Sequence, residues 1–221
     1  MQLENYDKIV CVNLKSRPDR LLAFNEDLPN EFKDKVVIFD AIDGNKLDLP
    51  DWWPGGHSGY GCYLSHRRIV EDAIQEDLDN ILILEDDAKF VPDFYNKFVE
   101  FNKEVPNDAE YILYGGQLSY VKAYPPEKVS EHVLRAFSVE RTHAYALIGK
   151  SILRAVHKHL SDVNWHRGHV DSRLTILQHT LSTCYVPDKW LVNQRESYSD
   201  LMKRDIQYNF SNPIDSLDID K

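Results

Sequence analysis

The sequence predicts an α/β fold in which a mostly parallel sheet is flanked by helices. Three segments are apolar and rich in β-branched residues, as strands buried on both faces require: KIVCVNL (8–14), VVIFDAI (36–42) and NILILEDDAKF (80–90). Helical segments alternate with these strands. Strand–helix–strand units form parallel sheets with right-handed crossovers, and this alternation therefore indicates the α/β class.

The remaining elements follow this pattern in order. A charged turn, KSRPDR (15–20), follows the first strand, and the second strand ends at the turn signal Asp43-Gly44-Asn45. Helices are predicted over 21–28, 62–74, 94–101, 150–160 and 171–179. Further strands are predicted over 111–116 and 142–148, and the segment 182–194 ends the ordered core. The segment 117–136 is the least regular, and Pro125-Pro126 predicts a surface loop or hairpin there.

The segment PDWWPGGHSGYG (50–61) is expected to be a flexible loop, because it is rich in Gly and Pro. Its two tryptophans, Trp52 and Trp53, have two interpretations of equal weight. They contribute to a binding surface, as exposed aromatic side chains often do, or they cover an edge of the sheet.

The length of 221 residues and the composition fit one globular domain. This domain is predicted over 1–200, followed by a polar and loosely held tail over 201–221. Hydrophobic residues make up 43% of the chain, which excludes disorder for the bulk of it. No apolar run approaches the ~20 residues of a membrane span, and MQLENYDKIV lacks the pattern of a signal peptide. Three cysteines without a CxxC pair are expected to be buried thiols rather than a zinc site or disulfides. A cytoplasmic protein is therefore expected.

The sharpest local feature is Glu85-Asp86-Asp87, at the end of an apolar strand. Adjacent carboxylates repel one another, and hard oxygen ligands suit Mg²⁺ or Mn²⁺. Strand alternation would put Glu85 and Asp87 on one face and Asp86 on the other. Ligands of α/β sheets bind beyond the carboxyl ends of the strands. The triplet therefore predicts a metal site that holds a diphosphate, with a solvated acidic turn as the alternative.

Arg17 and Arg20 lie just beyond the first strand, at the same predicted edge of the sheet. Two guanidinium groups around a Pro18 turn can grip phosphates or a base. The alternative is that they are helix-start charges paired with Asp19 or Glu26. The shared edge favours the ligand-binding interpretation.

Three further polar residues are candidates for binding or catalysis. Ser65 and His66 follow a Gly-rich loop at the start of a predicted helix, where anions can bind, although a lone helical His is more often a structural hydrogen-bonding group. Asp171 ends the polar cluster HRGHVD (166–171), whose spacing does not match a zinc site. A carboxylate such as Asp171 can instead act as general base on an acceptor hydroxyl.

Six motifs in the same order resemble glycosyltransferase family 25, which includes lipopolysaccharide glycosyltransferases and collagen galactosyltransferases. Each motif alone is a weak signal, but the occurrence of all six in the same order over about residues 8–200 is specific for the family. The motifs are VNLKSRPDR (12–20), FDAIDG (39–44), GYGCYLSHRRIVEDAI (59–74), ILILEDDAKF (81–90), THAYAL (142–147) and VPDKWLVNQRESYSD (186–200).

The resemblance implies a GT-A-like, Rossmann-like fold, a nucleotide-sugar donor that is commonly UDP-linked, Mn²⁺ as the usual metal, and inversion at the anomeric carbon. By position, Glu85 and Asp87 would hold the metal, and Asp171 is the expected base. Residues expected around the donor are Asn13, Arg17, Arg20, Ser65, His66, Thr142 and His143. The acceptor is expected to be a saccharide or glycoconjugate.

Three other functions remain open at this stage. A hydroxymethylated DNA base could be the acceptor, with Arg67, Arg68, Arg141, Lys158 and Arg167 as a basic strip, but 26 Lys and Arg against 36 Asp and Glu leave a net charge of -10. The same carboxylates could serve a metal-dependent phosphohydrolase or nucleotidyltransferase. A non-catalytic carbohydrate- or nucleotide-binding module is the third alternative.

Overall fold

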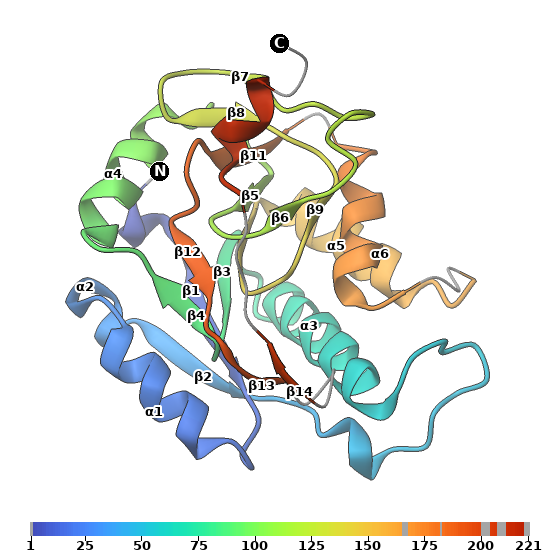
Figure 1. Ribbon diagram of the computed structural model, residues 1–221. Coiled ribbons are helices and arrows are strands. Elements are labelled where there is room, and N and C mark those ends of the chain that lie inside the picture. Colours follow the sequence, from blue (N-terminus) through green and yellow to red (C-terminus); the bar gives the residue numbers. More distant parts are fainter. Residues whose placement is uncertain (1, 165–167, 182, 200–203, 207–210, 219–221) are drawn as a thin grey trace.

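A computed structural model describes residues 2–164, 168–181, 183–199, 204–206 and 211–218 (Figure 1). Its centre is an eight-stranded sheet. In spatial order the strands are β2 (Val36–Asp40), β1 (Lys8–Asn13), β3 (Asn80–Glu85), β10 (Ala144–Ile148), β5 (Tyr111–Leu113), β11 (Cys184–Pro187), β8 (Val133–Arg135) and β7 (Glu127–Lys128).

Most strands of the sheet run in one direction. β2, β1 and β3 are mutually parallel, as are β5 and β11, whereas β10 is antiparallel to β3 and β5, and β8 is antiparallel to β11 and β7. In the described sheet only β10 and β8 are therefore reversed. The predicted α/β class with a mostly parallel sheet is confirmed.

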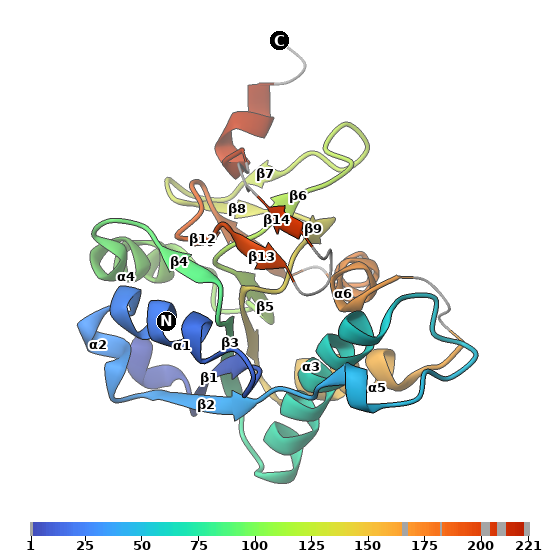
Figure 2. The same ribbon diagram turned by 60° about the horizontal axis from the view of Figure 1, so that its bottom comes forward.

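Helices cover both faces of the sheet, in two groups that Figures 1 and 2 separate. One face carries α1 (Pro18–Asp27), α2 (Asn30–Lys33) and α4 (Phe94–Glu104), and the other carries α3 (His57–Gln75), α5 (Lys150–Ser161) and α6 (Val170–Gln178). Each group buries its own core: Phe24, Phe32 and Phe98 pack on the first face, and Tyr63, Val70 and Leu153 on the second.

Short elements complete the described chain. Three two-stranded ribbons join β4 (Ala88–Phe90) to β12 (Val192–Gln194), β6 (Gln117–Leu118) to β9 (Val139–Glu140), and β13 (Ser197–Ser199) to β14 (Arg204–Ile206). Short 3-10 helices are η1 (Leu3–Asn5), η2 (Gly44–Lys46) and η3 (Pro213–Asp218). None of the helices in the described ranges is long and apolar enough to cross a membrane.

Two helices begin earlier than predicted. α1 starts at Pro18 rather than Leu21, because a proline at the first helical position loses no hydrogen bond. α3 starts at His57, so Gly59 and Gly61 of the predicted flexible loop are helical, whereas Gly55 and Gly56 precede the helix. A Cβ on Gly61 would lie 2.4 Å from the Ile42 carbonyl oxygen, and one on Gly44 would meet the His57 backbone. These glycines allow close packing of α3 against the 42–44 turn.

Two segments expected to be irregular have order among the described residues. The stretch 117–136 contains β6, β7 and β8, and the antiparallel pairing of β7 with β8 is the hairpin expected there as one alternative. The tail is attached to the core over 211–217, where Trp190 Nε1 donates to the Ser211 carbonyl at 3.0 Å and the Ile214 amide donates to the Asp188 carbonyl at 2.9 Å. The apolar side chain of Leu217 packs on the core there, which explains the attachment.

Candidate functional site

The acidic triplet lies where three strands end. Glu85 is the last residue of β3, and its amide donates to the His143 carbonyl at 3.0 Å. The Asp86 amide donates to the Val12 carbonyl of β1 at 3.1 Å. Because β10 is antiparallel to β3, its amino end brings Thr142 and His143 to the same edge. Backbone bonds to both neighbouring strands thus fix the triplet.

Arg20, in the first turn of α1, joins that helix to the two aspartates. Its Nη1 lies 3.1 Å from Asp86 Oδ1, and its Nη2 lies 2.5 Å from Asp87 Oδ2. Asn13 Nδ2 donates to Asp86 Oδ2 at 2.7 Å, and Gln194 Nε2 donates to Asp87 Oδ2 at 3.0 Å. The sequence predicted the shared edge for Asn13 and Arg20, and the structure brings both onto the carboxylates.

The two aspartates do not lie on opposite faces as strand alternation suggested. β3 ends at Glu85 and β4 begins at Ala88, so Asp86 and Asp87 form the turn between two strands. Alternation requires extended backbone and does not continue through a turn. Both aspartates therefore reach the same guanidinium, whereas Glu85 contacts a different set of partners.

Glu85 contacts the helix on the other face of the sheet. Its Oε1 accepts a hydrogen bond from the Thr142 hydroxyl and lies 3.3 Å from His66 Nε2. Burial by itself would raise the pKa of Glu85, but the interactions with His66 and Thr142 outweigh it and lower this pKa to about 2. Glu85 is thus held as a carboxylate.

The two aspartates have raised pKa values. Burial raises the pKa of Asp86 to about 7, with Arg20 opposing the shift and the charge of Asp87 adding to it. Burial and the charge of Glu85 also raise the pKa of Asp87. The buried Asp86 and Asp87 share the guanidinium of Arg20, and the half-buried Glu85 adds a third carboxylate, which leaves an excess of negative charge at this edge.

A divalent cation fits this donor set. Asp87 Oδ1 is buried and has no hydrogen-bond partner among the described residues. An orphaned buried carboxylate oxygen is costly, and a bound cation would satisfy it. The neighbouring ligand atoms are carboxylate oxygens, which Mg²⁺ and Mn²⁺ prefer. Glu85 and Asp87, the residues predicted as metal ligands, therefore have the chemistry that a bound Mg²⁺ or Mn²⁺ ion requires.

Other predicted donor-side residues take different positions. His66 is buried within α3, well past the first turn of a helix that starts at His57, so it does not lie at a helix N-terminus. The Ser65 hydroxyl donates to the Gly61 carbonyl at 2.7 Å and accepts from the Ile42 amide at 2.8 Å. Ser65 is fully buried, and these two hydrogen bonds tie α3 to the strand-end turn.

Arg17 pairs locally. Its Nη2 lies 2.8 Å from Asp19 Oδ2, and this interaction lowers the pKa of the exposed Asp19 to about 2. This is the helix-start pairing considered as the alternative for this arginine. The Arg17 carbonyl also accepts a hydrogen bond from Asn13 Nδ2 at 3.1 Å, which keeps the turn beside Asp86.

His143 and Asp171 border the same region. His143 is buried, its Nε2 lies 3.1 Å from the Val192 carbonyl, and burial lowers its pKa against the opposing charge of Asp87. Asp171 is half-buried in the first turn of α6, where its Oδ1 accepts from the Ser172 amide at 2.8 Å. Burial raises the pKa of Cys62, and the charges of Glu85 and Asp171 raise it further. Cys62 therefore lies within electrostatic range of both carboxylates.

The two tryptophans pack in the core rather than forming an exposed surface. The Trp53 ring is buried 5.2 Å from the Tyr63 ring, and Trp52 lies 6.0 Å from Tyr63. The guanidinium of Arg173, a fully buried residue on α6, lies 5.0 Å from the Tyr63 ring and 5.5 Å from the Trp52 ring. Both rings thus contact side chains of α3 and α6, so they cover these helices rather than an edge of the sheet.

Sequence reasoning missed several residues here. Gln194 and Arg173 received no role, although Gln194 lies within one of the six motifs. Of the proposed basic strip, Arg68 pairs with Asp72 at 2.7 Å and Arg141 donates to Gln117 at 3.1 Å. Arg167, His166 and the motif residue Asp200 lie outside the described residues.

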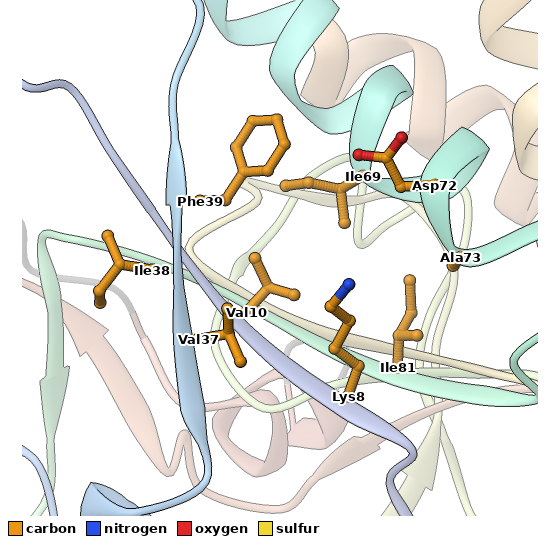
Figure 3. Close-up of a pocket in the computed structure, with 9 residues that line it drawn as sticks. All are labelled: Lys8, Val10, Val37, Ile38, Phe39, Ile69, Asp72, Ala73 and Ile81. Atoms are coloured by element: carbon orange, nitrogen blue, oxygen red, sulfur yellow. The ribbon is translucent and has the colours of Figure 1, made fainter. Parts of the chain in front are cut away.

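A small cavity lies away from this site (Figure 3). Its volume is about 70 Å³, and it lies between α3 and the strands β2, β1 and β3. The lining includes Lys8 and Ile81, at the amino ends of their strands, opposite the end that carries Glu85. Pockets for drug-sized ligands measure roughly 300–1,000 Å³, so this cavity is too small for a nucleotide-sugar.

Comparison with known protein families shows to which family the chain is related. The family model for glycosyltransferase family 25 (LPS biosynthesis protein) matches residues 55–168, just over half of the chain. The match includes α3, the acidic triplet and β10. The chain belongs to glycosyltransferase family 25. The acidic motif at a strand end of an α/β sheet agrees with the GT-A-like fold that the resemblance implied.

Individual relatives of this family 25 chain are longer. It is 30% identical over 167 residues to procollagen galactosyltransferase 2 of Mus musculus, covering 66% of this chain and 26% of that protein. It is 30% identical over 145 residues to the inactive glycosyltransferase 25 family member 3 of Homo sapiens, covering 56% and 23%. The chain thus spans about a quarter of the length of these curated relatives.

A solved structure is also similar to this family 25 chain. It is a glycosyltransferase involved in the glycosylation of the major capsid of PBCV-1, 10% identical in sequence. The similarity covers 81% of this chain and 79% of that one, with a TM-score of 0.49.

Proposed function

We propose that this chain is a glycosyltransferase that moves a sugar from a nucleotide-sugar donor to a hydroxyl group, with a divalent cation and with inversion at the anomeric carbon. Family membership supports the reaction class. The observation that carries the metal dependence is the buried Asp87 Oδ1, which has no hydrogen-bond partner in the part of the chain that the structure describes and which feels the charge of Glu85.

Glu85 and Asp87 would hold Mn²⁺ or Mg²⁺. When bound, the cation would offset the negative charge that develops on the leaving diphosphate. Arg20 orients Asp87 through its 2.5 Å ion pair and adds a positive charge at the same edge. Thr142 orients Glu85 through its hydroxyl. The ligand carboxylates are thereby held in place before a donor binds.

The nucleotide would bind beyond β1, where Asn13, Arg17 and Arg20 lie. Asn13 contacts both Asp86 and the Arg17 carbonyl, so it fixes the turn that would face the nucleotide. His66 and His143 lie on either side of Glu85, one on α3 and one before β10. A donor at this edge follows the general rule that α/β sheets bind ligands beyond their carboxyl ends.

Asp171 would serve as the base. A direct displacement with inversion needs a carboxylate on the face of the sugar opposite the leaving group, where it removes the proton of the acceptor hydroxyl. Asp171 lies in the first turn of α6, and its charge, like that of Glu85, raises the pKa of Cys62. The acceptor would be a saccharide or glycoconjugate hydroxyl near Asp171.

The test is a thermal-shift panel of nucleotide-sugars, each with Mn²⁺ and with a chelator. The mouse relative is named a galactosyltransferase, so UDP-galactose comes first in the panel. A donor that binds the folded state raises the unfolding midpoint. We expect a shift with one donor class that requires Mn²⁺. The absence of a shift with every donor would contradict the proposal.

A non-catalytic binding module is the second candidate, because one human relative is named inactive. Turnover separates the two functions. A transferase consumes the donor in the presence of acceptor saccharides, and Asp87→Asn abolishes this turnover without loss of folding. A binding module retains the Mn²⁺-dependent shift but releases no nucleotide diphosphate.

A further inference from the structure

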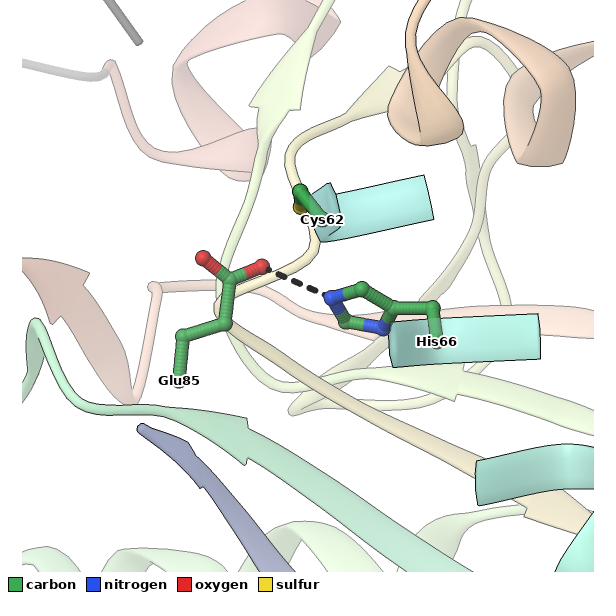
Figure 4. Close-up of side chains that lie close together, drawn as sticks. All are labelled: Cys62, His66 and Glu85. Carbon is green, nitrogen blue, oxygen red and sulfur yellow. Dashed lines mark ion pairs between the residues drawn. The ribbon is translucent and has the colours of Figure 1, made fainter. Parts of the chain in front are cut away.

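Three different ligand atoms converge beside the acidic triplet. The Sγ of Cys62, a ring nitrogen of His66 and a carboxylate oxygen of Glu85 lie within 4.8 Å of one another (Figure 4). Cys62 and His66 are four residues apart on α3, which puts both side chains on one face of the helix. Glu85 approaches this face from the end of β3. Two rigid elements therefore supply the cluster.

His66 is oriented like a metal ligand. Its Nδ1 lies 2.9 Å from the Tyr145 hydroxyl, and both residues are fully buried. Its Nε2 faces Glu85 Oε1 at 3.3 Å and has no hydrogen-bond partner among the described residues. A ligating histidine commonly uses one nitrogen for the metal while a neighbouring group holds the other. The Tyr145 hydroxyl would hold Nδ1 of His66 in this way and leave Nε2 for the metal.

The donor atoms indicate which metal would bind. Sulfur, imidazole nitrogen and carboxylate oxygen together suit Zn²⁺, whereas Mg²⁺ and Mn²⁺ prefer oxygen alone. We propose that Cys62, His66 and Glu85 form a binding site for a zinc-class divalent cation. On binding, the thiol proton leaves to solvent and the thiolate donates an electron pair to the cation. A water molecule completes four-fold coordination.

This site differs from the one expected for Mn²⁺, although the two share Glu85. Cys62 lacks the CxxC spacing typical of zinc sites in sequence, because its partner ligand Glu85 comes from another element. If Glu85 also holds Mn²⁺, as the proposed function requires, the two cations compete for its carboxylate. Zn²⁺ then inhibits transfer, and excess Mn²⁺ relieves the inhibition. The zinc site itself stands without that function.

The test is titration of the full chain with Co²⁺, which replaces Zn²⁺ and is coloured. We expect a near-ultraviolet thiolate-to-cobalt charge-transfer band and the intense visible bands of tetrahedral Co²⁺, both removed by added Zn²⁺. Cys62→Ser abolishes the charge-transfer band. Cys184→Ala, at another buried cysteine, retains it. Tyr145→Phe, which frees His66 Nδ1, weakens Co²⁺ binding about 10-fold.

Asp87→Asn distinguishes this proposal from the proposed function. It removes an expected Mn²⁺ ligand but none of the three zinc ligands, so it retains the cobalt spectrum. If wild-type protein gives no charge-transfer band, or if Cys62→Ser gives the same band, the zinc site is wrong. Should Cys62→Ser fail to fold by circular dichroism, His66→Gln replaces it, with at least a 10-fold loss of Co²⁺ affinity expected.

Discussion

Arg20 Nη2 lies 2.5 Å from Asp87 Oδ2, although the two residues are 67 positions apart in the chain. This ion pair joins the first turn of α1, the helix after β1, to the turn after β3, at the edge where those parallel strands end. It places a positive charge against a carboxylate that burial would otherwise neutralise. Four predictions follow from this edge and from the elements that support it.

Arg20→Gln is expected to destabilise the fold. The change leaves Asp86 and Asp87 buried without their cation, and breaking a buried pair costs about 3–5 kcal/mol. Arg17→Gln is the matched control, because Arg17 pairs with an exposed aspartate and such pairs contribute about 0–1 kcal/mol. Urea denaturation measures both free energies of unfolding. Equal values for the two variants would contradict the central role of Arg20.

The free energy of unfolding is expected to fall as pH rises from about 4 to 7 in the presence of a chelator. The pKa of Asp86 is about 7 in the folded chain, above the ordinary aspartate value, so the folded state binds more protons in this range. Ionisation of Asp86 therefore removes stability as pH increases. Asp86→Asn should flatten this dependence in denaturation curves at pH 5 and pH 8. An unchanged slope would mean that Asp86 is already ionised at pH 5.

Gly61→Ala is expected to lower the unfolding midpoint by several degrees. Its Cβ would lie 2.4 Å from the Ile42 carbonyl oxygen, so α3 would have to move from the strand-end turn. Overpacking of this kind costs about 1–3 kcal/mol. Gly56→Ala is the control, since no atom lies within 4 Å of the added Cβ. A smaller shift for Gly61→Ala than for Gly56→Ala in thermal unfolding would contradict the close-packing account.

Asp171→Asn is expected to lower turnover at least 100-fold while donor affinity stays within about 2-fold. A general base acts on the acceptor hydroxyl and contributes about 10²–10⁴-fold to the rate. The amide retains the size of the side chain and its contact with the Ser172 amide. Steady-state kinetics and donor titration provide the two values. A collapse of donor affinity would assign Asp171 to the donor instead.

The sequence predicted the sheet edge because its strands are unusually clear. β1, β2 and β3 are continuous apolar runs, and parallel strands end at one edge, which brings Asn13 and Arg20 to the acidic triplet. The pairing of Arg20 with both aspartates did not follow, because it depends on the turn that breaks 80–90 into β3 and β4. Strand alternation cannot anticipate such a turn.

Other parts of the site depend on contacts between distant segments. Gln194 reaches Asp87 across 107 residues, and Arg173 is buried against Trp52 of a separate segment. The start of α3 at His57 could not be predicted, because glycines that permit close helix packing are indistinguishable from glycines of a flexible loop. The proximity of Cys62 to Glu85 could not be predicted either, because it is a contact between two segments that are distant in the sequence.

The most direct measurement is calorimetric titration of UDP into wild type and Asp87→Asn, each with Mn²⁺ and with a chelator. The account predicts binding to wild type that requires Mn²⁺, and a loss of at least 10-fold in affinity for Asp87→Asn with Mn²⁺ present. Circular dichroism should give the same spectrum for both proteins. Metal-independent binding, or equal Mn²⁺-dependent affinity in wild type and Asp87→Asn, would contradict a metal site built on Asp87.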